Sequence, residues 1–159
     1  MRSNQASASS MFTRRSVFTA AGIGVATIAG LPEPAGAAPM SDSEKANVQV
    51  VNAFCSAWPN RNVEQLISFF ADNCAYRVTE TQEPYKGRQA VTDRFKSMVD
   101  HIQSFDVIET FARGPMVFNE RKDHFTGGAL KMWHGVGVFF LKEGKIVEWY
   151  DYTIDVERR

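Results

Sequence analysis

The sequence contains few cysteines, and their arrangement excludes the commonest structural metal sites. Its 159 residues include only Cys55 and Cys74, with no Cys-x-x-Cys pair and no histidine–cysteine cluster, so nothing predicts a zinc site. Cys55 falls on the apolar face of a helical pattern, as a buried thiol would. Because sequence does not supply the geometry that a bridge needs, we favour two free thiols over a disulfide.

The sequence also lacks the signatures of several catalytic classes. No Gly-x-Ser-x-Gly stretch is present, so the serine nucleophile of many hydrolases has no counterpart. His101, His124 and His134 show no metal-ligand spacing, and each suits an ordinary surface or core position. We therefore expect no metal ion and no other cofactor.

Neither charge is in excess. Lysine and arginine together number 18, as do aspartate and glutamate. Binding to nucleic acid or to an anionic membrane surface depends on clustered positive charge, so the composition supports neither partner. With 44% hydrophobic residues, the chain can form the core of one domain. The expected partners are small molecules or a second copy of the chain.

No apolar run suits a membrane span. The stretch 17–31 is short and rich in glycine, alanine and threonine. It follows the arginine pair at 14–15 and precedes "AGA" at 35–37, as in a secretory signal, and the paired arginines resemble a twin-arginine export signal. We predict that residues 1–37 direct export to the periplasm or medium and that 38–159 form one domain without stable membrane association. An uncleaved membrane tether and a disordered tail are the alternatives.

Helical periodicity dominates the part that follows. Apolar residues recur every three or four positions across 41–58, where Ser41 and Glu44 fit a capping box. The segments 62–73 and 88–102 predict a second and a third helix.

Strands dominate the remainder, and Glu143-Gly144 predicts a hairpin between two of them. Helices followed by a long antiparallel meander indicate an α+β fold, with the helices packed on one side of a curved mixed sheet that forms a cone. A concave interior of this kind suits a small-molecule ligand. The predicted strands are 74–78, 104–113, 116–125, 129–142 and 146–157.

Three ionisable residues are candidates for a common site. Arg121 and Asp123 share one face of a strand through their i, i+2 spacing, and Asp151 lies on the final strand of the same meander. An arginine between two buried carboxylates offsets the cost of burying them. Two nearby carboxylates resist joint ionisation, so one can act as a general acid and the other as a general base. The alternative is an exposed surface ion pair.

The predicted strand 129–142 carries candidates for the wall of the site. Trp133, Gly135, Gly137 and Phe139 alternate onto one face. They suit a pocket wall or core, and the glycines would provide curvature or room for a ligand. Trp149 is a further candidate for the pocket, although the core suits it as well.

The residues from about Glu44 to Val156 resemble the limonene-1,2-epoxide hydrolase family, within the SnoaL-like and nuclear-transport-factor-2-like superfamily. The order of elements agrees throughout. The specific matches are "ETF" at 109–111, "ERKD" at 120–123, "GVF" at 137–139, "EGKI" at 143–146 and "W-x-DY" at 149–152.

This resemblance implies roles for particular residues. Asp123 would donate a proton to the epoxide oxygen, Asp151 would accept one from the attacking water, and Arg121 would bridge the two carboxylates. Tyr76 would help to hold the water. The family's second water-binding residue, an asparagine, is replaced by Val78. The resemblance further implies a small apolar epoxide and water as reactants, no metal or covalent intermediate, and a homodimer.

The replacement at Val78 leaves other reactions open. Valine cannot hold a water molecule, although Glu80 would lie on the same face if the strand continued. A substrate hydroxyl could attack instead, giving ring closure, or the epoxide could isomerise; the same acid–base pair serves all three reactions. Two rivals remain, a non-catalytic binding protein and a SnoaL-like cyclase or ketosteroid-isomerase-like enzyme.

Overall fold

The computed structural model describes residues 38–159; the predicted export signal over residues 1–37 lies outside them. None of the described helices is long and apolar enough to cross a membrane. The elements are α1 (Asp42–Ala57), the 3-10 helix η1 (Trp58–Asn60), α2 (Val63–Ser68), β1 (Phe70–Arg77), β2 (Tyr85–Lys86), α3 (Arg88–Met98), β3 (Ile102–Arg113), β4 (Met116–Phe125), β5 (Leu130–Lys142) and β6 (Lys145–Arg158).

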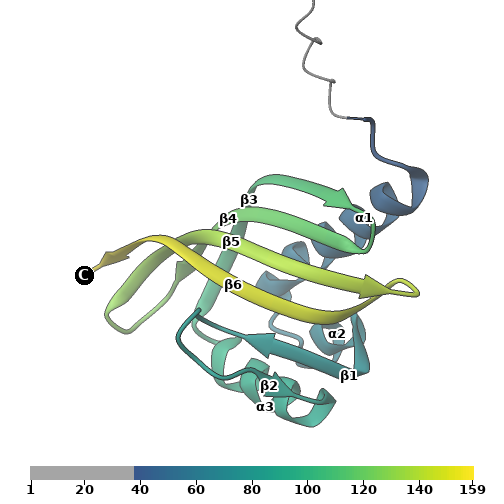
Figure 1. Ribbon diagram of the computed structural model, residues 1–159. Coiled ribbons are helices and arrows are strands. Elements are labelled where there is room, and N and C mark those ends of the chain that lie inside the picture. Colours follow the sequence, from purple (N-terminus) through teal and green to yellow (C-terminus); the bar gives the residue numbers. More distant parts are fainter. Residues whose placement is uncertain (1–37) are drawn as a thin grey trace, which may run out of the picture. The chain divides into compact units, whose positions relative to one another are not determined.

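The six strands form one curved mixed sheet in the order β2-β1-β6-β5-β4-β3. The chain from β3 to β6 is an antiparallel meander, and β1 joins it by running parallel to β6. Figure 1 shows the helices on one side of the sheet, while the opposite face of β3–β6 carries no helix. The α+β architecture predicted from the order of elements is confirmed.

The first helix begins as its sequence predicts. The Ser41 side chain accepts a hydrogen bond from the backbone N–H of Glu44, and the Glu44 carboxylate accepts one from the backbone N–H of Ser41. The same carboxylate also accepts from the backbone N–H of Gly114, over 2.7 Å. The capping box therefore ties the start of α1 to the β3–β4 turn.

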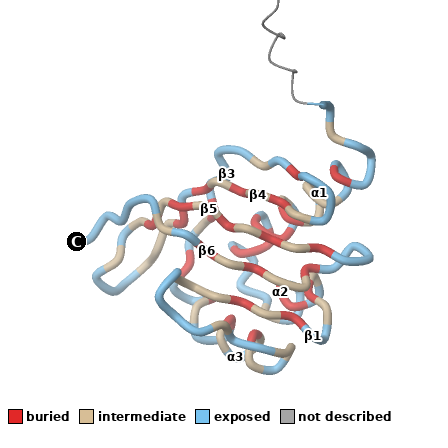
Figure 2. The backbone as a smooth tube through the Cα atoms, in the orientation of Figure 1, coloured by how far each residue is buried: buried red, intermediate tan, exposed pale blue. Residues whose placement is uncertain are grey.

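Alternation along the strands separates a buried face from an open one. In β4, Val117, Asn119, Arg121 and Asp123 are buried and their neighbours are less so. Figure 2 shows this as alternating red and tan segments along β4 and β5. The inward side chains meet α1, where the Phe54 ring lies within about 6 Å of the rings of Trp58, Phe69, Phe70, Phe95, Phe139 and Trp149.

Two helix boundaries need correction, one strand was missed, and the predicted hairpin is confirmed. The third helix ends at Met98 rather than 102, because Ile102 already pairs with Phe125 as the first residue of β3. The second helix ends at Ser68 rather than 73, because Phe70 already pairs with Ile146 as the first residue of β1. The two-residue strand β2 was not predicted. The hairpin between β5 and β6 is present, and both Glu143 and Gly144 have positive φ, as a tight two-residue turn requires.

Both cysteines are buried and free. Cys55 lies in α1 beside Asn119, with its Sγ 3.6 Å from the amide oxygen, and burial raises the pKa of its thiol to about 12. It is therefore a neutral core side chain at physiological pH.

Candidate active site

Arg121, Asp123 and Asp151 meet on the helix-facing side of the sheet. Arg121 and Asp123 lie on β4 and Asp151 on β6, with β5 between them. Arg121 Nη2 is 2.9 Å from Asp151 Oδ1 and Arg121 Nε is 2.9 Å from Asp123 Oδ1. All three side chains are buried. The predicted contact between one guanidinium and two carboxylates is therefore present, and an exposed surface pair is excluded.

Aromatic rings enclose the guanidinium. The Arg121 Cζ atom lies 4.8 Å from the Phe105 ring centroid, 5.0 Å from that of Trp133 and 5.3 Å from that of Trp149. Burial would lower the pKa of Arg121, but Asp123 and Asp151 outweigh it and raise the pKa. The group therefore remains a cation, held by two carboxylates and three ring faces.

A missing side chain on β5 makes room for this cation. Gly137 pairs with Asn119 on one side and with Asp151 on the other. A Cβ atom at Gly137 would lie 2.5 Å from Arg121 Nη1 and 2.7 Å from the Phe139 ring. Only glycine lets the arginine lie across β5 toward Asp151 without displacing its neighbours.

The two carboxylates are held unequally. Asp151 Oδ1 accepts hydrogen bonds from Arg121 Nη2 at 2.9 Å and from Trp149 Nε1 at 2.7 Å. Asp123 accepts only a longer bond, 3.3 Å from Arg121 Nη2, and its Oδ1 forms an ion-pair contact without hydrogen-bond alignment. Asp151 is therefore the better-stabilised anion.

Burial sets the protonation of this pair. It raises the pKa of Asp123 to about 7, against the opposing effect of Arg121 and with a further rise from Asp151. Burial also raises the pKa of Asp151, opposed by Arg121, by the hydrogen bond from Trp149 and by the nearby Tyr76 hydroxyl. Near neutral pH, Asp123 therefore carries a proton in a large fraction of molecules, and the two hydrogen bonds to Asp151 make Asp151 the carboxyl that ionises more readily.

Tyr76 completes the polar group. Its ring stacks on Trp149 with centroids 4.0 Å apart, and its hydroxyl lies near enough to Asp151 to lower the pKa of that carboxyl. Burial raises the pKa of Tyr76 well above its usual range, so the hydroxyl stays neutral and can donate.

A cavity of about 310 Å³ opens beside these groups, between the sheet and α3. Of the predicted site residues, Tyr76, Val78, Asp123, Trp133 and Asp151 line it. Trp133 is held in place by a 3.0 Å hydrogen bond from its Nε1 to Thr153 Oγ1. The remaining lining residues are Thr79, Arg94, Ser97, Met98, His101, Ile102, Phe125 and Leu130.

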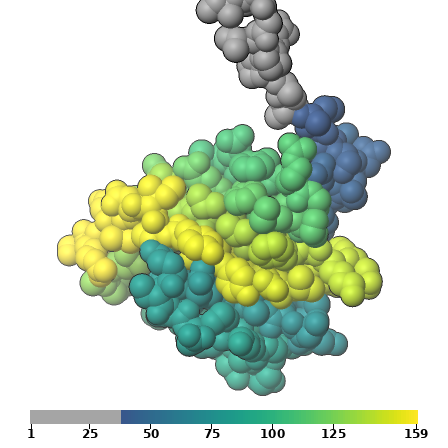
Figure 3. All heavy atoms as spheres, viewed as in Figure 1, coloured from purple at the N-terminus to yellow at the C-terminus, as the bar shows by residue number. Residues whose placement is uncertain are grey.

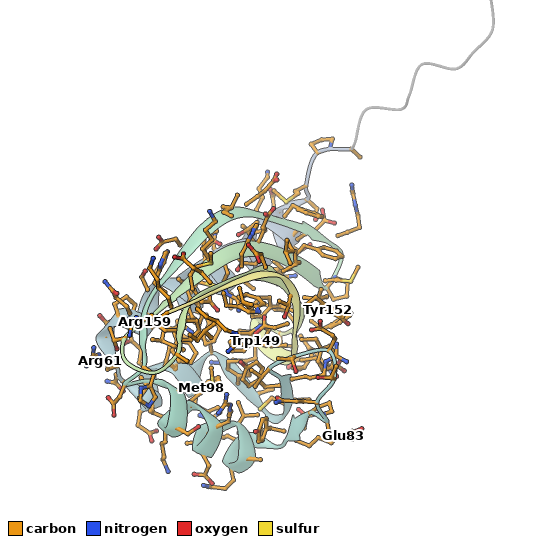
Figure 4. All side chains as sticks on the ribbon, turned by 90° about the vertical axis from the view of Figure 1, so that its left-hand side faces the viewer. Arg61, Glu83, Met98, Trp149, Tyr152 and Arg159 are labelled. Atoms are coloured by element: carbon orange, nitrogen blue, oxygen red, sulfur yellow. The ribbon has the colours of Figure 1, made fainter. Side chains whose placement is uncertain are left out.

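Three predicted wall residues lie elsewhere. Phe139 is fully buried, stacked against Trp149 and beside Phe54 under α1. Trp149 is also fully buried and belongs to the core, as Figure 4 shows, although its indole N–H reaches Asp151. Gly135 lies beneath the Trp133 ring, where a Cβ atom would sit 2.2 Å from the ring; it shapes the wall without forming it.

Glu80 does not lie beside Val78 on the inward face of β1, as it would if the strand continued. Val78 lines the cavity, but β1 ends at Arg77, so Glu80 does not continue the inward face. Glu80 is exposed and accepts a 3.5 Å hydrogen bond from Thr153. Glu80 therefore gives no support to a water molecule near Val78, and Tyr76 and Asp151 are the polar residues among the predicted site residues that line the cavity beside it with Asp123.

The contribution of α3 and of the residues after it to the cavity was not predicted from the sequence. Arg94, Ser97, Met98 and His101 line the cavity together. The apolar residues Val91 and Phe95 of α3 indicated which side of the helix packs on the core, and both are buried. They did not indicate which side faces the cavity. Positions 94, 97, 98 and 101 recur every three or four residues, so they lie on one helical face beside those two apolar residues. This periodicity was visible in the sequence, but most of the residues on that face are polar and were not recognised as lining a cavity.

The comparisons with known proteins agree with this fold. The SnoaL-like domain family matches residues 51–149, so the chain belongs to the SnoaL-like family. The match includes Tyr76, Arg121 and Asp123 and ends just before Asp151. The six-stranded curved sheet with helices on one side is the nuclear-transport-factor-2-like fold.

Three solved structures illustrate this likeness. An LEH-like epoxide hydrolase of M. tuberculosis shares 23% identity at a TM-score of 0.61, covering 70% of this chain and 85% of that one. The epoxide hydrolase/cyclase-like enzyme SalBIII has a role in pyran ring formation in the polyether salinomycin. It shares 19% identity at a TM-score of 0.68, and the match covers 76% of this chain and 100% of that one. An NTF2-like protein of unknown function from Mesorhizobium loti shares 20% identity at a TM-score of 0.62, and the match covers 74% of this chain and 98% of that one. At these identities the likeness establishes the fold.

In the described residues 38–159, no group of three or more histidine, cysteine, aspartate or glutamate side chains is arranged to hold a metal ion.

Proposed function

We propose that this protein is a cofactor-independent epoxide hydrolase that adds water to a small epoxide in one step. The observation that carries the proposal is the unequal holding of two buried carboxylates by one arginine at the wall of a cavity. A general acid and a general base side by side are what the opening of an epoxide by water requires. Two solved structures named for epoxide chemistry, one as an epoxide hydrolase and one as hydrolase/cyclase-like, share the fold and support an epoxide as the reacting group.

In the proposed reaction, Asp123 is the acid. Its proton passes to the epoxide oxygen as the carbon–oxygen bond breaks. A pKa of about 7 suits this role, because the group is substantially protonated near neutral pH and still a useful donor. Its position on the cavity wall lets it reach a bound ligand.

Asp151 is the base. Water attacks the epoxide carbon as Asp151 takes one of its protons, so the product is a diol with both hydroxyl protons accounted for. The hydrogen bonds from Arg121 and Trp149 keep the carboxylate ionised and fix its direction. Tyr76 donates to the same region and helps to hold the water. A proton shift from Asp151 to Asp123 then restores the starting state.

A cyclase or isomerase is the second candidate, and Val78 favours it. With an apolar side chain at this wall position, the attacking water loses one hydrogen-bond partner, which costs roughly tenfold to a thousandfold in rate. An attacking hydroxyl of the substrate would need no such partner. Val78→Asn separates the two candidates: increased diol formation where the native protein forms little would favour the cyclase or isomerase.

The direct test uses the purified domain and a panel of cyclic and terpene epoxides. We expect diol formation by the native protein and a loss of roughly a thousandfold or more in kcat/KM for Asp123→Asn and for Asp151→Asn. Retained ligand binding without turnover of any epoxide by the native protein would instead favour a binding protein. Export remains a prediction, which fractionation of cells expressing the full chain would test.

A further inference from the structure

Arg94 is a cation that faces the cavity without an acidic partner. It lies on α3 and lines the same cavity as Asp123 and Asp151. The other two basic residues of α3 are paired: Arg88 lies 3.6 Å from Asp72, and Lys96 lies 3.1 Å from Asp93. Within residues 38–159, Arg94 has no carboxylate at ion-pair distance, so it is the exception on its helix.

The helix holds this guanidinium in place but does not satisfy it. Arg94 Nη1 donates to Ser97 Oγ over 3.1 Å, and the same hydroxyl donates back to the Arg94 carbonyl over 2.7 Å. Arg94 Nε is buried and has no hydrogen-bond partner in the described part of the chain. The Nε–H of the guanidinium is therefore unused, and a buried donor without a partner is unfavourable until a ligand supplies one.

The charges around the cavity favour an anion. With Asp123 protonated and Asp151 ionised, Arg121 and its two carboxylates sum to zero. Arg94 then leaves the cavity with one uncompensated positive charge. Its effect reaches the opposite wall, since it lowers the pKa of Tyr76 against the larger effect of burial. Many of the other lining side chains are apolar, so an ion pair formed here would be stronger than one in open solvent.

We infer that the substrate carries an anionic group of the carboxylate class, bound by Arg94, at the end opposite to the epoxide. This inference rests on the proposed function and refines its substrate from a wholly apolar epoxide to an epoxy acid. The planar guanidinium fork matches a carboxylate through two parallel hydrogen bonds. The acid–base pair on the sheet and the cation on α3 would then fix the substrate at both ends.

The first test measures binding without turnover. Titration calorimetry compares cyclohexanecarboxylate with cyclohexanecarboxamide, which have nearly the same shape and differ in charge. We expect the native protein to bind the carboxylate about tenfold or more tightly than the amide. Arg94→Gln should abolish this preference, Arg94→Lys should keep part of it, and Lys96→Gln, which removes a paired cation from the same helix, should leave it intact.

Equal binding of the two probes by the native protein would overturn the inference. A preference that survives in Arg94→Gln would also overturn it, because the anion would then be bound elsewhere. Equal urea midpoints for Arg94→Gln, Arg94→Lys and the native protein ensure that the comparison reports binding rather than folding.

The second test separates this inference from the proposed function. It compares 3,4-epoxycyclohexane-1-carboxylate with the corresponding carboxamide. We expect Arg94→Gln to raise KM about tenfold or more for the acid and to leave KM for the amide nearly unchanged. If the carboxylate binds preferentially but neither epoxide opens, the anion site stands and the epoxide reaction fails. If both epoxides open equally well with or without Arg94, the reaction stands and the anion site fails.

Discussion

The indole Nε1 of Trp149 donates a 2.7 Å hydrogen bond to Oδ1 of Asp151, two residues further along β6. The i, i+2 spacing places both side chains on the inner face of one strand. The same oxygen accepts from Arg121. A core residue outside the cavity wall therefore helps to keep the proposed base ionised.

Replacing Trp149 by phenylalanine should weaken the base. Trp149→Phe removes one hydrogen bond to the ionised form of Asp151, so the pKa of that carboxyl rises. We expect kcat/KM to fall about tenfold to a hundredfold at pH 7 and the acidic limb of the pH–rate profile to move to higher pH. The profile of initial rates from pH 4 to 9 measures both effects.

Trp58→Phe is the matched control for this change. Trp58 is equally buried, but its Nε1 has no hydrogen-bond partner in the described residues. The control should alter stability without moving the acidic limb. An unchanged limb in Trp149→Phe would show that the indole N–H does not tune the base.

The alkaline limb should report the proposed acid. Asp123 must carry its proton to donate it, and its pKa lies at about 7. The rate kcat/KM should therefore fall as pH rises above about 7, by roughly tenfold for each further unit. A rate that stays constant up to pH 9 would contradict the assignment of Asp123 as the acid.

The same carboxyl should make stability depend on pH. Burial raises the pKa of Asp123 from 3.8 to about 7 on folding, so between these values the folded state binds a proton that the unfolded state has lost. Its contribution to stability is therefore present at pH 4 and lost as pH rises through 7. Asp123→Asn, which cannot ionise, should be more stable than the native protein at pH 8 by on the order of 2 kcal/mol.

Urea unfolding at pH 5 and pH 8 measures this difference. The advantage of Asp123→Asn should shrink at pH 5, where the native carboxyl is also neutral. An advantage of the same size at both values would trace to packing rather than to ionisation.

Gly137→Ala should displace Arg121. The added Cβ atom would lie 2.5 Å from Arg121 Nη1 and 3.2 Å from Asp151 Oδ1, so the guanidinium must move away from its partners. We expect a loss of about 1 to 3 kcal/mol of stability and at least a hundredfold loss in kcat/KM. Urea unfolding and initial rates test this, and native rates in Gly137→Ala would show that the arginine needs no such clearance.

We propose that the uncovered face of the sheet forms a homodimer. One row of paired residues on this face runs Phe111, Phe118, Val138 and Tyr150 across β3–β6. Phe111 stacks on Phe118 at 5.0 Å and is 48% exposed. Figure 3 shows atoms of β3–β6 open to solvent on this side, and Figure 4 places Tyr152 at its surface. A contiguous apolar surface of this kind commonly marks an interface.

Light scattering after size exclusion tests the dimer. Phe111→Glu places a charge in this face and should shift the native dimer to monomer. Gln65→Glu, which adds the same charge to an exposed position of α2, should leave it a dimer. A monomeric native protein at about 100 μM, far above the dissociation constant of a stable dimer, would exclude the proposal.

The sequence predicted those parts of the fold and site that depend on local pattern. The capping box at Ser41, the hairpin at Glu143-Gly144 and the shared face of Arg121 and Asp123 each follow from spacing over a few residues. The boundary at Phe70 was not predictable in this way, because "LISFFAD" fits a helix and a buried strand equally well. The strand assignment there depends on pairing with β6, which lies far away in the chain.

The sequence also could not predict where along the inner face of the sheet a side chain lies. Alternation shows which face a side chain occupies but not what covers it. On β5, Phe139 and Trp133 share the inner face, yet Phe139 packs beside Phe54 of α1 while Trp133 lies where the cavity opens. Arg94 was missed because a charged residue on the flank of a helix usually faces water.

Isotope labelling tests the central claim most directly. A single turnover of an epoxide that the protein hydrolyses is run with excess protein in oxygen-18 water. Mass spectrometry then measures the oxygen-18 content of the product. Direct attack by water activated at Asp151 predicts one labelled oxygen in the diol from the first turnover. Unlabelled diol in that turnover, with the label found instead in a carboxylate of the protein, would reveal a covalent ester and contradict the account. A product that contains no solvent oxygen because the epoxide cyclised or isomerised would contradict it as well.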